Sequence, residues 1–225
     1  LIINSLNKKK IIQNLDVRDS LSNSESFDII INTVKLYDFD AVLTEVLEKI
    51  KKNYIFLPFQ NGIYSEEKIK ETLGLKNTYG AVAQISSVVN SEQEIDHIGK
   101  LATFFVGRYD QQYDKKLDVF CQECQKIGLD IRFKNNIKEK IWDKFIFLSA
   151  YSGITTLTEK TIGEIFETPE LKKKFIEAMH ETYNLSKSYG INFKSNPVKS
   201  WLEKIDKMPS EMTSSMFYDF KKKKD

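Results

Sequence analysis

The chain has 225 residues, of which 41% are apolar and 29% charged, a balance that is ordinary for a folded globular protein. Its formal net charge is +2 with the two signs mixed along the chain, so nothing in the composition favours nucleic acid or an anionic membrane as a partner. No apolar stretch approaches the ~20 residues of a membrane-spanning helix, and no signal peptide is visible. The chain begins at Leu1, inside an apolar run typical of a strand, and we expect it to be part of a longer protein.

The first part of the chain alternates short apolar runs with helical patterns. Apolar or β-branched runs predict strands at Phe27–Val34, Tyr54–Pro58, Tyr79–Asn90, Ala102–Gly107 and Leu129–Phe133. Helical periodicity predicts helices at Tyr37–Lys52, Ser65–Leu73 and Asp110–Ile127. Strand, helix and strand following one another within roughly 30 residues form a βαβ unit, which predicts a parallel sheet flanked by helices.

The period changes from Asn135 onward, where nothing resembles a strand. Helices are predicted at Ile137–Tyr151, Lys160–Phe166, Glu170–Ser188 and Ser195–Lys207. The change places a domain boundary near residues 134–136, so we expect an α/β domain at 1–134 followed by an all-α domain at 135–225. We interpret the closing lysine run, Lys221–Lys224, as a solvated end.

The cysteines and histidines give no pattern typical of a metal site. Cys121 and Cys124 form one C-x-x-C in a helical pattern, without a second pair or a nearby histidine, so a reduced pair is expected and zinc is not. A reduced pair is typical of a cytoplasmic protein. His97 and His180 are far apart in the sequence, and each is more typical of a structural residue than of a catalytic one.

A lysine lies near the start of the most apolar helical segment, Trp142–Thr158. Four apolar residues run together at Phe145–Leu148, which predicts a buried helix. On that helix Lys144 lies over Phe147 and Leu148. An ammonium held against apolar surface is costly unless it has a partner or a task. Two interpretations stay open, a functional lysine and a lysine whose charged head reaches water.

Polar residues follow two of the predicted strands. Ligands of an open parallel sheet bind beyond the carboxyl ends of its strands. Lys35 follows the first strand and could contact a phosphate or a cofactor ribose, and Asn61 follows the second and could hydrogen-bond an amide or a carboxylate. A solvated lysine and an Asn61-Gly62 turn pair are equally good interpretations. The nine glycines include no G-x-G-x-x-G, so the dinucleotide fingerprint is not in this chain.

The segment Pro209–Phe220 is typical of the start of an amphipathic helix. It carries Ser214, Ser215 and, four residues after the second serine, Asp219 on the same face. The hydroxyl groups could cap the helix or bind a substrate carboxylate.

Several stretches, taken together, resemble the ketopantoate reductase (2-dehydropantoate 2-reductase) family over nearly the whole chain. They are LPFQNG at 57–62, WDKF at 142–145, TLT at 156–158 and TSSMFYD at 213–219, with Val34-Lys35, Val106-Gly107 and ETYNLSKSYGI at 181–191 in matching order and spacing. In this family a Rossmann-type domain binds NADPH, and a helical domain like the 6-phosphogluconate dehydrogenase C-terminal domain closes over the keto acid. The resemblance therefore implies a partial Rossmann-type parallel sheet domain, without its first βαβ part, and a helical substrate domain.

The resemblance also implies a reaction and a set of roles. The reaction is the NADPH-dependent reduction of 2-dehydropantoate to pantoate, which leads to pantothenate and coenzyme A. Lys144 would protonate the ketone oxygen as hydride reaches the carbon, a task that suits an ammonium group. Lys35 and Asn61 would contact the cofactor. Substrate would be bound by Asn61, Ser152, Ser215 and Asp219. A homodimer is also expected.

The chain departs from the family pattern in its helical half. The family usually has asparagines four and eight residues after the lysine, where this chain has Leu148 and Ser152. A polar contact is thereby lost, so a reductase of another small 2-keto acid remains an alternative. The family's glycine-rich turn would precede Leu1, and its active-site glutamate would follow the lysine-rich end.

Two further alternatives belong to different classes of protein. A degenerate relative could bind a nucleotide or a partner without turnover. A related dehydrogenase could act on a hydroxy acid or a polyol phosphate, but a phosphate substrate favours an arginine cluster. The arginines lie outside the helical half, at Arg18, Arg108 and Arg132.

Overall fold

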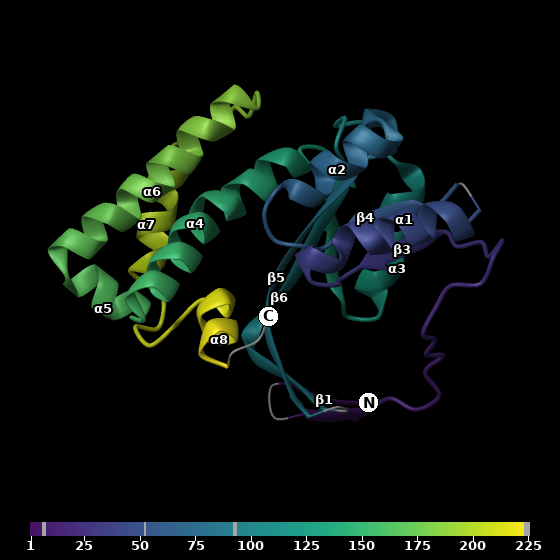
Figure 1. Cartoon of the computed structure of the whole chain (residues 1–225), viewed down its shortest axis with the longest axis horizontal. Helices are drawn as coiled ribbons and strands as arrows, with labels where there is room; N and C mark the ends of the chain where they lie inside the picture. The colour runs from purple at the N-terminus through teal and green to yellow at the C-terminus, as the bar shows by residue number, and fades with distance from the viewer. Residues whose placement is uncertain (6–7, 52, 92–93, 223–225) are drawn as a thin grey trace. The chain divides into compact units, whose positions relative to one another are not determined.

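The computed structural model describes residues 1–5, 8–51, 53–91 and 94–222. It divides into two compact units, Leu1–Ile137 and Lys138–Asp225. The first unit combines strands with helices and the second is helical (Figure 1), which confirms the expected α/β part followed by an all-α part. Lys52, at the end of the first predicted helix, and part of the closing lysine run lie outside the described residues.

The elements of the first unit are short except for one strand pair. The strands are β1 (Ile2–Ser5), β2 (Lys8–Ile11), β3 (Ile29–Asn32), β4 (Ile55–Pro58), β5 (Tyr79–Ser91), β6 (Glu94–Arg108) and β7 (Asp130–Phe133). The helices are α1 (Phe39–Lys49), α2 (Tyr64–Leu73) and α3 (Lys115–Lys126), with 3-10 turns at η1 (Leu36–Asp38) and η2 (Leu75–Asn77).

The β3–α1–β4 segment is the βαβ unit that the sequence predicts. β3 and β4 pair in parallel, in the register Ile29↔Ile55 to Asn32↔Pro58. α1 buries Phe39, Leu43 and Val46 in a core cluster that also contains Phe56 of β4. Parallel pairing brings the carboxyl ends of the two strands to one edge.

The second sheet of this unit is mixed, and the expectation of a parallel sheet is wrong for part of it. β5 and β6 form a long antiparallel pair, β1 and β7 each pair with β6 in parallel, and β2 pairs with β1 antiparallel. β6 begins at Glu94, well before the predicted start at Ala102, and the pair extends to β1 (Figure 1). Ile98 and Leu101 in the added part are more than half exposed, so this stretch lacks the apolar run by which a buried strand is identified.

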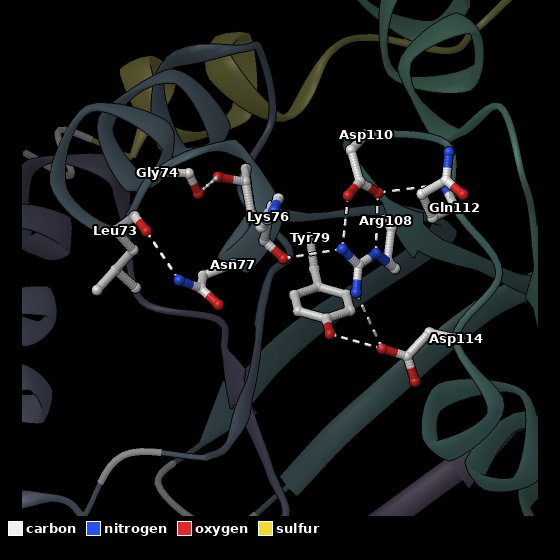
Figure 2. A network of polar contacts seen from close by, with 10 residues as sticks. Leu73, Gly74, Lys76, Asn77, Tyr79, Arg108, Asp110, Gln112 and Asp114 are labelled. Carbon is white, nitrogen blue, oxygen red and sulfur yellow. Dashed lines mark hydrogen bonds and ion pairs between the residues drawn. The ribbon is translucent and has the colours of Figure 1, made fainter.

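A polar network joins the β5–β6 pair to the start of α3 (Figure 2). Arg108 donates to both carboxylate oxygens of Asp110, at 2.8 and 2.5 Å. Its Nη1 is 3.7 Å from Oδ2 of Asp114, which also accepts a hydrogen bond from the Tyr79 hydroxyl at 2.7 Å. The other carboxylate oxygen of Asp114 accepts from a backbone N–H in the first turn of α3 and caps that helix. The helix therefore begins after Asp114 and not at Asp110, where the sequence predicted its start.

The second unit packs its helices around aromatic and aliphatic side chains. Its helices are α4 (Ile137–Thr158), α5 (Ile162–Glu167), α6 (Pro169–Ser188), α7 (Pro197–Ile205) and α8 (Ser215–Lys221). Phe147 of α4 stacks on Trp201 of α7 with ring centroids 4.4 Å apart. α4 continues to Thr158, past the predicted end at Tyr151, and its extension buries Thr155. In the described part of the chain, no helix has the length and apolarity needed to cross a membrane.

Candidate functional site

The first group of predicted site residues follows β3 and β4 at their shared carboxyl edge. Lys35 lies directly before η1, and Asn61 lies in the loop between β4 and α2; both are exposed. Gly62 after Asn61 has a φ of +93°, a conformation that side chains with a Cβ rarely adopt. The structure therefore brings the Lys35 and Asn61 segments to one edge of the β3–β4 pair.

Two amide side chains that the sequence analysis did not identify connect these segments. Gln60 Nε2 donates to Asn32 Oδ1 and to the carbonyl oxygen of Val34, each at 2.9 Å. The Val34 N–H donates to the same Asn32 oxygen at 3.1 Å. Asn32 is 4% exposed, and its Nδ2 has no hydrogen-bond partner among the described residues. The sequence feature that could have indicated this contact is Asn32 itself, a polar residue within the apolar run that predicts the strand.

Lys144 lies in the first half of α4 and is half-buried. Ile141, one turn before it, and Phe147, one turn after it, are 3% and 6% exposed. Leu148 packs against the core cluster of the helical unit. The lysine therefore lies on a helix whose neighbouring turns are held in the core, which fixes its backbone.

Ser152, Ser215 and Asp219 lie in the same unit as Lys144. Ser152 is half-buried on α4, Ser215 is the exposed first residue of α8, and Asp219 is half-buried on α8. The N-cap of α8 is Ser214, whose hydroxyl oxygen accepts from a backbone N–H at 3.1 Å. The Ser214 hydroxyl is also 2.7 Å from that of Thr155, a contact that joins α8 to α4. The capping role therefore belongs to Ser214, and Ser215 is not the cap.

The two cysteines lie on α3, and His97 makes contacts between neighbouring parts of its own sheet. Cys121 and Cys124 are free thiols, and burial raises the pKa of Cys121 to about 12. His97 contacts the Ser5 hydroxyl through Nδ1 at 2.8 Å and the Leu101 carbonyl oxygen through Nε2 at 3.0 Å. Within the described ranges, no three histidine, cysteine, aspartate or glutamate side chains are grouped in a way that could hold a metal ion.

Comparison with known proteins identifies the family of the chain. The sequence model described as "Ketopantoate reductase PanE/ApbA" matches residues 1–111, and "Ketopantoate reductase PanE/ApbA C terminal" matches residues 136–225. The chain belongs to the ketopantoate reductase family. The resemblance noted in the sequence is thereby confirmed for both halves.

The curated relatives are longer than this chain. The 2-dehydropantoate 2-reductase of Pyrococcus horikoshii is 26% identical over 192 residues, which cover 85% of this chain and 62% of that protein. The uncharacterised oxidoreductase YkpB of Bacillus subtilis is 24% identical over 149 residues, 66% of this chain and 49% of that protein. The chain thus spans between about half and two thirds of the length of these relatives.

Solved structures share the fold of the chain. 2-Dehydropantoate 2-reductase from Geobacter metallireducens superposes with a TM-score of 0.88 at 19% identity, covering all of this chain and 75% of that one. A ternary structure of D-mandelate dehydrogenase with NADH and anilino(oxo)acetate gives a TM-score of 0.85 at 18% identity, covering 99% and 72%. At these identities the likeness establishes the fold only.

Proposed function

We propose that the protein containing this chain reduces 2-dehydropantoate to pantoate with NADPH, in the biosynthesis of pantothenate and coenzyme A. The observation that carries the proposal is Lys144, a half-buried lysine on a core helix of a ketopantoate reductase family member. The similarity of the chain to the 2-dehydropantoate 2-reductase of Pyrococcus horikoshii supports this reaction.

The first unit has side chains that suit a nicotinamide nucleotide. The carboxyl edge of a parallel strand pair is where such ligands bind in open α/β sheets. At that edge Lys35 offers an ammonium for a phosphate, and Asn61 offers an amide. When bound, the reduced nicotinamide supplies the hydride. The role of Asn61 is to hydrogen-bond cofactor and substrate, and Lys35 holds the cofactor.

Lys144 acts at the ketone oxygen of the substrate. Its ammonium polarises the carbonyl group and donates a proton to the oxygen as negative charge develops there. Ser215 binds the carboxylate of the substrate, Ser152 contributes a hydroxyl from α4, and Asp219 lies one turn beyond Ser215 on α8. The chain's own residues thus account for two steps, the polarisation of the carbonyl group and the donation of a proton, both by Lys144.

The test is NADPH oxidation by the full-length protein with ketopantoate, compared with a Lys144→Ala variant. Loss of a general acid typically lowers the rate ~10²-fold or more, so kcat should fall by that factor while the Kd of NADPH is nearly unchanged. Lys199→Ala, which removes an exposed lysine from α7, is the matched control and should keep wild-type kinetics. Wild-type protein that binds no NADPH, or that oxidises it only independently of any 2-keto acid, would refute the proposal.

One observation favours a second candidate, a reductase of a less polar 2-keto acid. Leu148 replaces the family's first asparagine and packs against the helical core, so an apolar side chain stands where the family offers an amide. The D-mandelate dehydrogenase neighbour was solved with anilino(oxo)acetate, an oxo acid derivative with an aromatic group. The two candidates are separated by dividing kcat/KM for ketopantoate by kcat/KM for 3,3-dimethyl-2-oxobutanoate, which lacks the hydroxyl group of ketopantoate. A ratio below one favours the second, and NADPH binding without turnover of either acid favours a non-catalytic relative.

We also propose that the protein is a cytoplasmic homodimer. The free cysteines of α3 support a reducing compartment. Light scattering of the full-length protein tests the dimer, and cell fractionation tests the location.

A further inference from the structure

A buried asparagine ends β3, where an apolar residue is typical. Strands of a parallel sheet usually read as continuous apolar runs because helices cover them. Asn32 is 4% exposed, and its oxygen accepts hydrogen bonds from Gln60 Nε2 at 2.9 Å and from the Val34 N–H at 3.1 Å. The side chain therefore links the end of its own strand with the end of β4.

These bonds hold the residues directly before the two that the proposed function assigns to the cofactor. Val34 directly precedes Lys35, and Gln60 directly precedes Asn61. Gln60 Nε2 also donates to the Val34 carbonyl oxygen at 2.9 Å, so both N–H groups of the amide have acceptors on the β3 side. A planar amide held by two acceptors has little rotational freedom left. The two segments that leave the sheet edge are thus tied to each other by side chains.

We propose that Asn32 is a positioning residue for the nicotinamide nucleotide. Its carboxamide oxygen fixes Gln60 and the Val34 N–H, and so sets the conformations in which Lys35 and Asn61 leave the edge. The inference rests on the proposed function, because it concerns the cofactor of that reaction. Asn32 acts through its neighbours and takes no part in the chemical step.

A double-mutant cycle separates this role from simple stabilisation of the β3–β4 pair. The variants are Asn32→Leu, Gln60→Leu and the double variant, each in the full-length protein. The measurements are the Kd of NADPH, kcat at saturating NADPH, and the urea unfolding midpoint. Thr103→Val is the control, because it removes another hydrogen bond between neighbouring strands, from Thr103 Oγ1 to Asp130 Oδ2 at 2.8 Å.

The loss of a positioning hydrogen bond should weaken NADPH binding by about 3- to 10-fold in each single variant. The double variant should weaken NADPH binding by less than the product of the two single effects, since the Asn32–Gln60 hydrogen bond is lost in both single variants. The kcat at saturation should stay near that of the wild type, and Thr103→Val should bind NADPH as the wild type does.

Three results would overturn the inference. They are an unchanged Kd in the single variants, single effects that multiply in the double variant, and an equal loss of NADPH binding in Thr103→Val. Should Asn32→Leu fail to fold, Gln60→Leu decides alone, because it removes the same contact from the half-buried partner. A wild-type protein without NADPH affinity would refute the proposed function itself, an outcome that is visible before any variant is made.

Discussion

Replacing Gly107 with alanine would place a methyl group against the backbone of a neighbouring segment. A Cβ at Gly107 would be 2.0 Å from the carbonyl oxygen of Lys134 and 3.0 Å from Cβ of Ile137. Unstrained contacts need ~3.5 Å, so Lys134 would have to move by more than ~1 Å. That movement breaks the 2.8 Å hydrogen bond from the Lys134 N–H to the Val106 oxygen and strains the last pair of the β6–β7 ladder. One or two lost hydrogen bonds at ~1 kcal/mol each, with 1–3 kcal/mol of overpacking, give a destabilisation of about 2–5 kcal/mol.

The same substitution at Gly153 should have the opposite sign. Gly153 is an exposed residue of α4, and a Cβ there would meet no atom within 4 Å. Alanine in place of glycine in a helix should stabilise the protein by about 0.5–1 kcal/mol. Urea unfolding is followed by far-UV circular dichroism, which reports both units, and by the fluorescence of Trp142 and Trp201, which reports the helical unit. A Gly107→Ala variant within about 1 kcal/mol of the wild type would refute the reasoning.

The remaining predictions concern buried polar and titratable groups. The Tyr151 hydroxyl is buried without a partner among the described residues, so Tyr151→Phe should leave the free energy of unfolding unchanged or raise it by up to about 1 kcal/mol; a clear decrease would contradict this. The hydrogen bond from Arg108 holds the pKa of Asp110 below its usual range. The stabilisation is therefore present above about pH 4 and is lost as the pH falls through the lower folded-state value, so Asp110→Asn should flatten the acid limb of stability against pH. Burial raises the pKa of Cys121 to about 12, so a thiol reagent at pH 8 should modify Cys124 first, as mass spectrometry would show.

The sequence predicts the parallel β3–α1–β4 unit and the helical second unit because their patterns are local. A β-branched apolar run and a 3.6-residue period depend on burial along one segment. The mixed sheet was not predictable in the same way. The pattern of Tyr79–Asn90 indicates a strand, but it does not indicate whether the partner runs parallel or antiparallel. The first part of β6, before Ala102, could not be predicted as a strand because neither of its faces carries a continuous row of apolar residues.

In the candidate site, too, local features could be predicted and contacts between distant residues could not. Lys35 and Asn61 could be placed at one sheet edge because parallel strands bring their carboxyl ends together, which follows from the element order alone. The Asn32–Gln60 contact was missed because its partners are 28 residues apart and meet only in one register. The sequence offered both Ser214 and Ser215 as caps of α8 without deciding between them. Adjacent serines offer the same chemistry, and the phase of the helix selects Ser214.

The amide of Asn32 has a small net effect on stability when its hydrogen bonds are counted together. Two accepted hydrogen bonds contribute about 1 kcal/mol each, whereas a buried nitrogen without a partner in the described chain costs about 1–3 kcal/mol. Leucine at this position would remove both terms and add apolar contact, so the free energy of unfolding should change by no more than about 1 kcal/mol. A residue that is nearly neutral for stability yet determines where two ligand-facing segments leave a sheet should affect ligand affinity more than folding. The unfolding midpoint and the NADPH affinity of Asn32→Leu are therefore expected to separate, and a parallel loss of both would identify Asn32 as a structural residue.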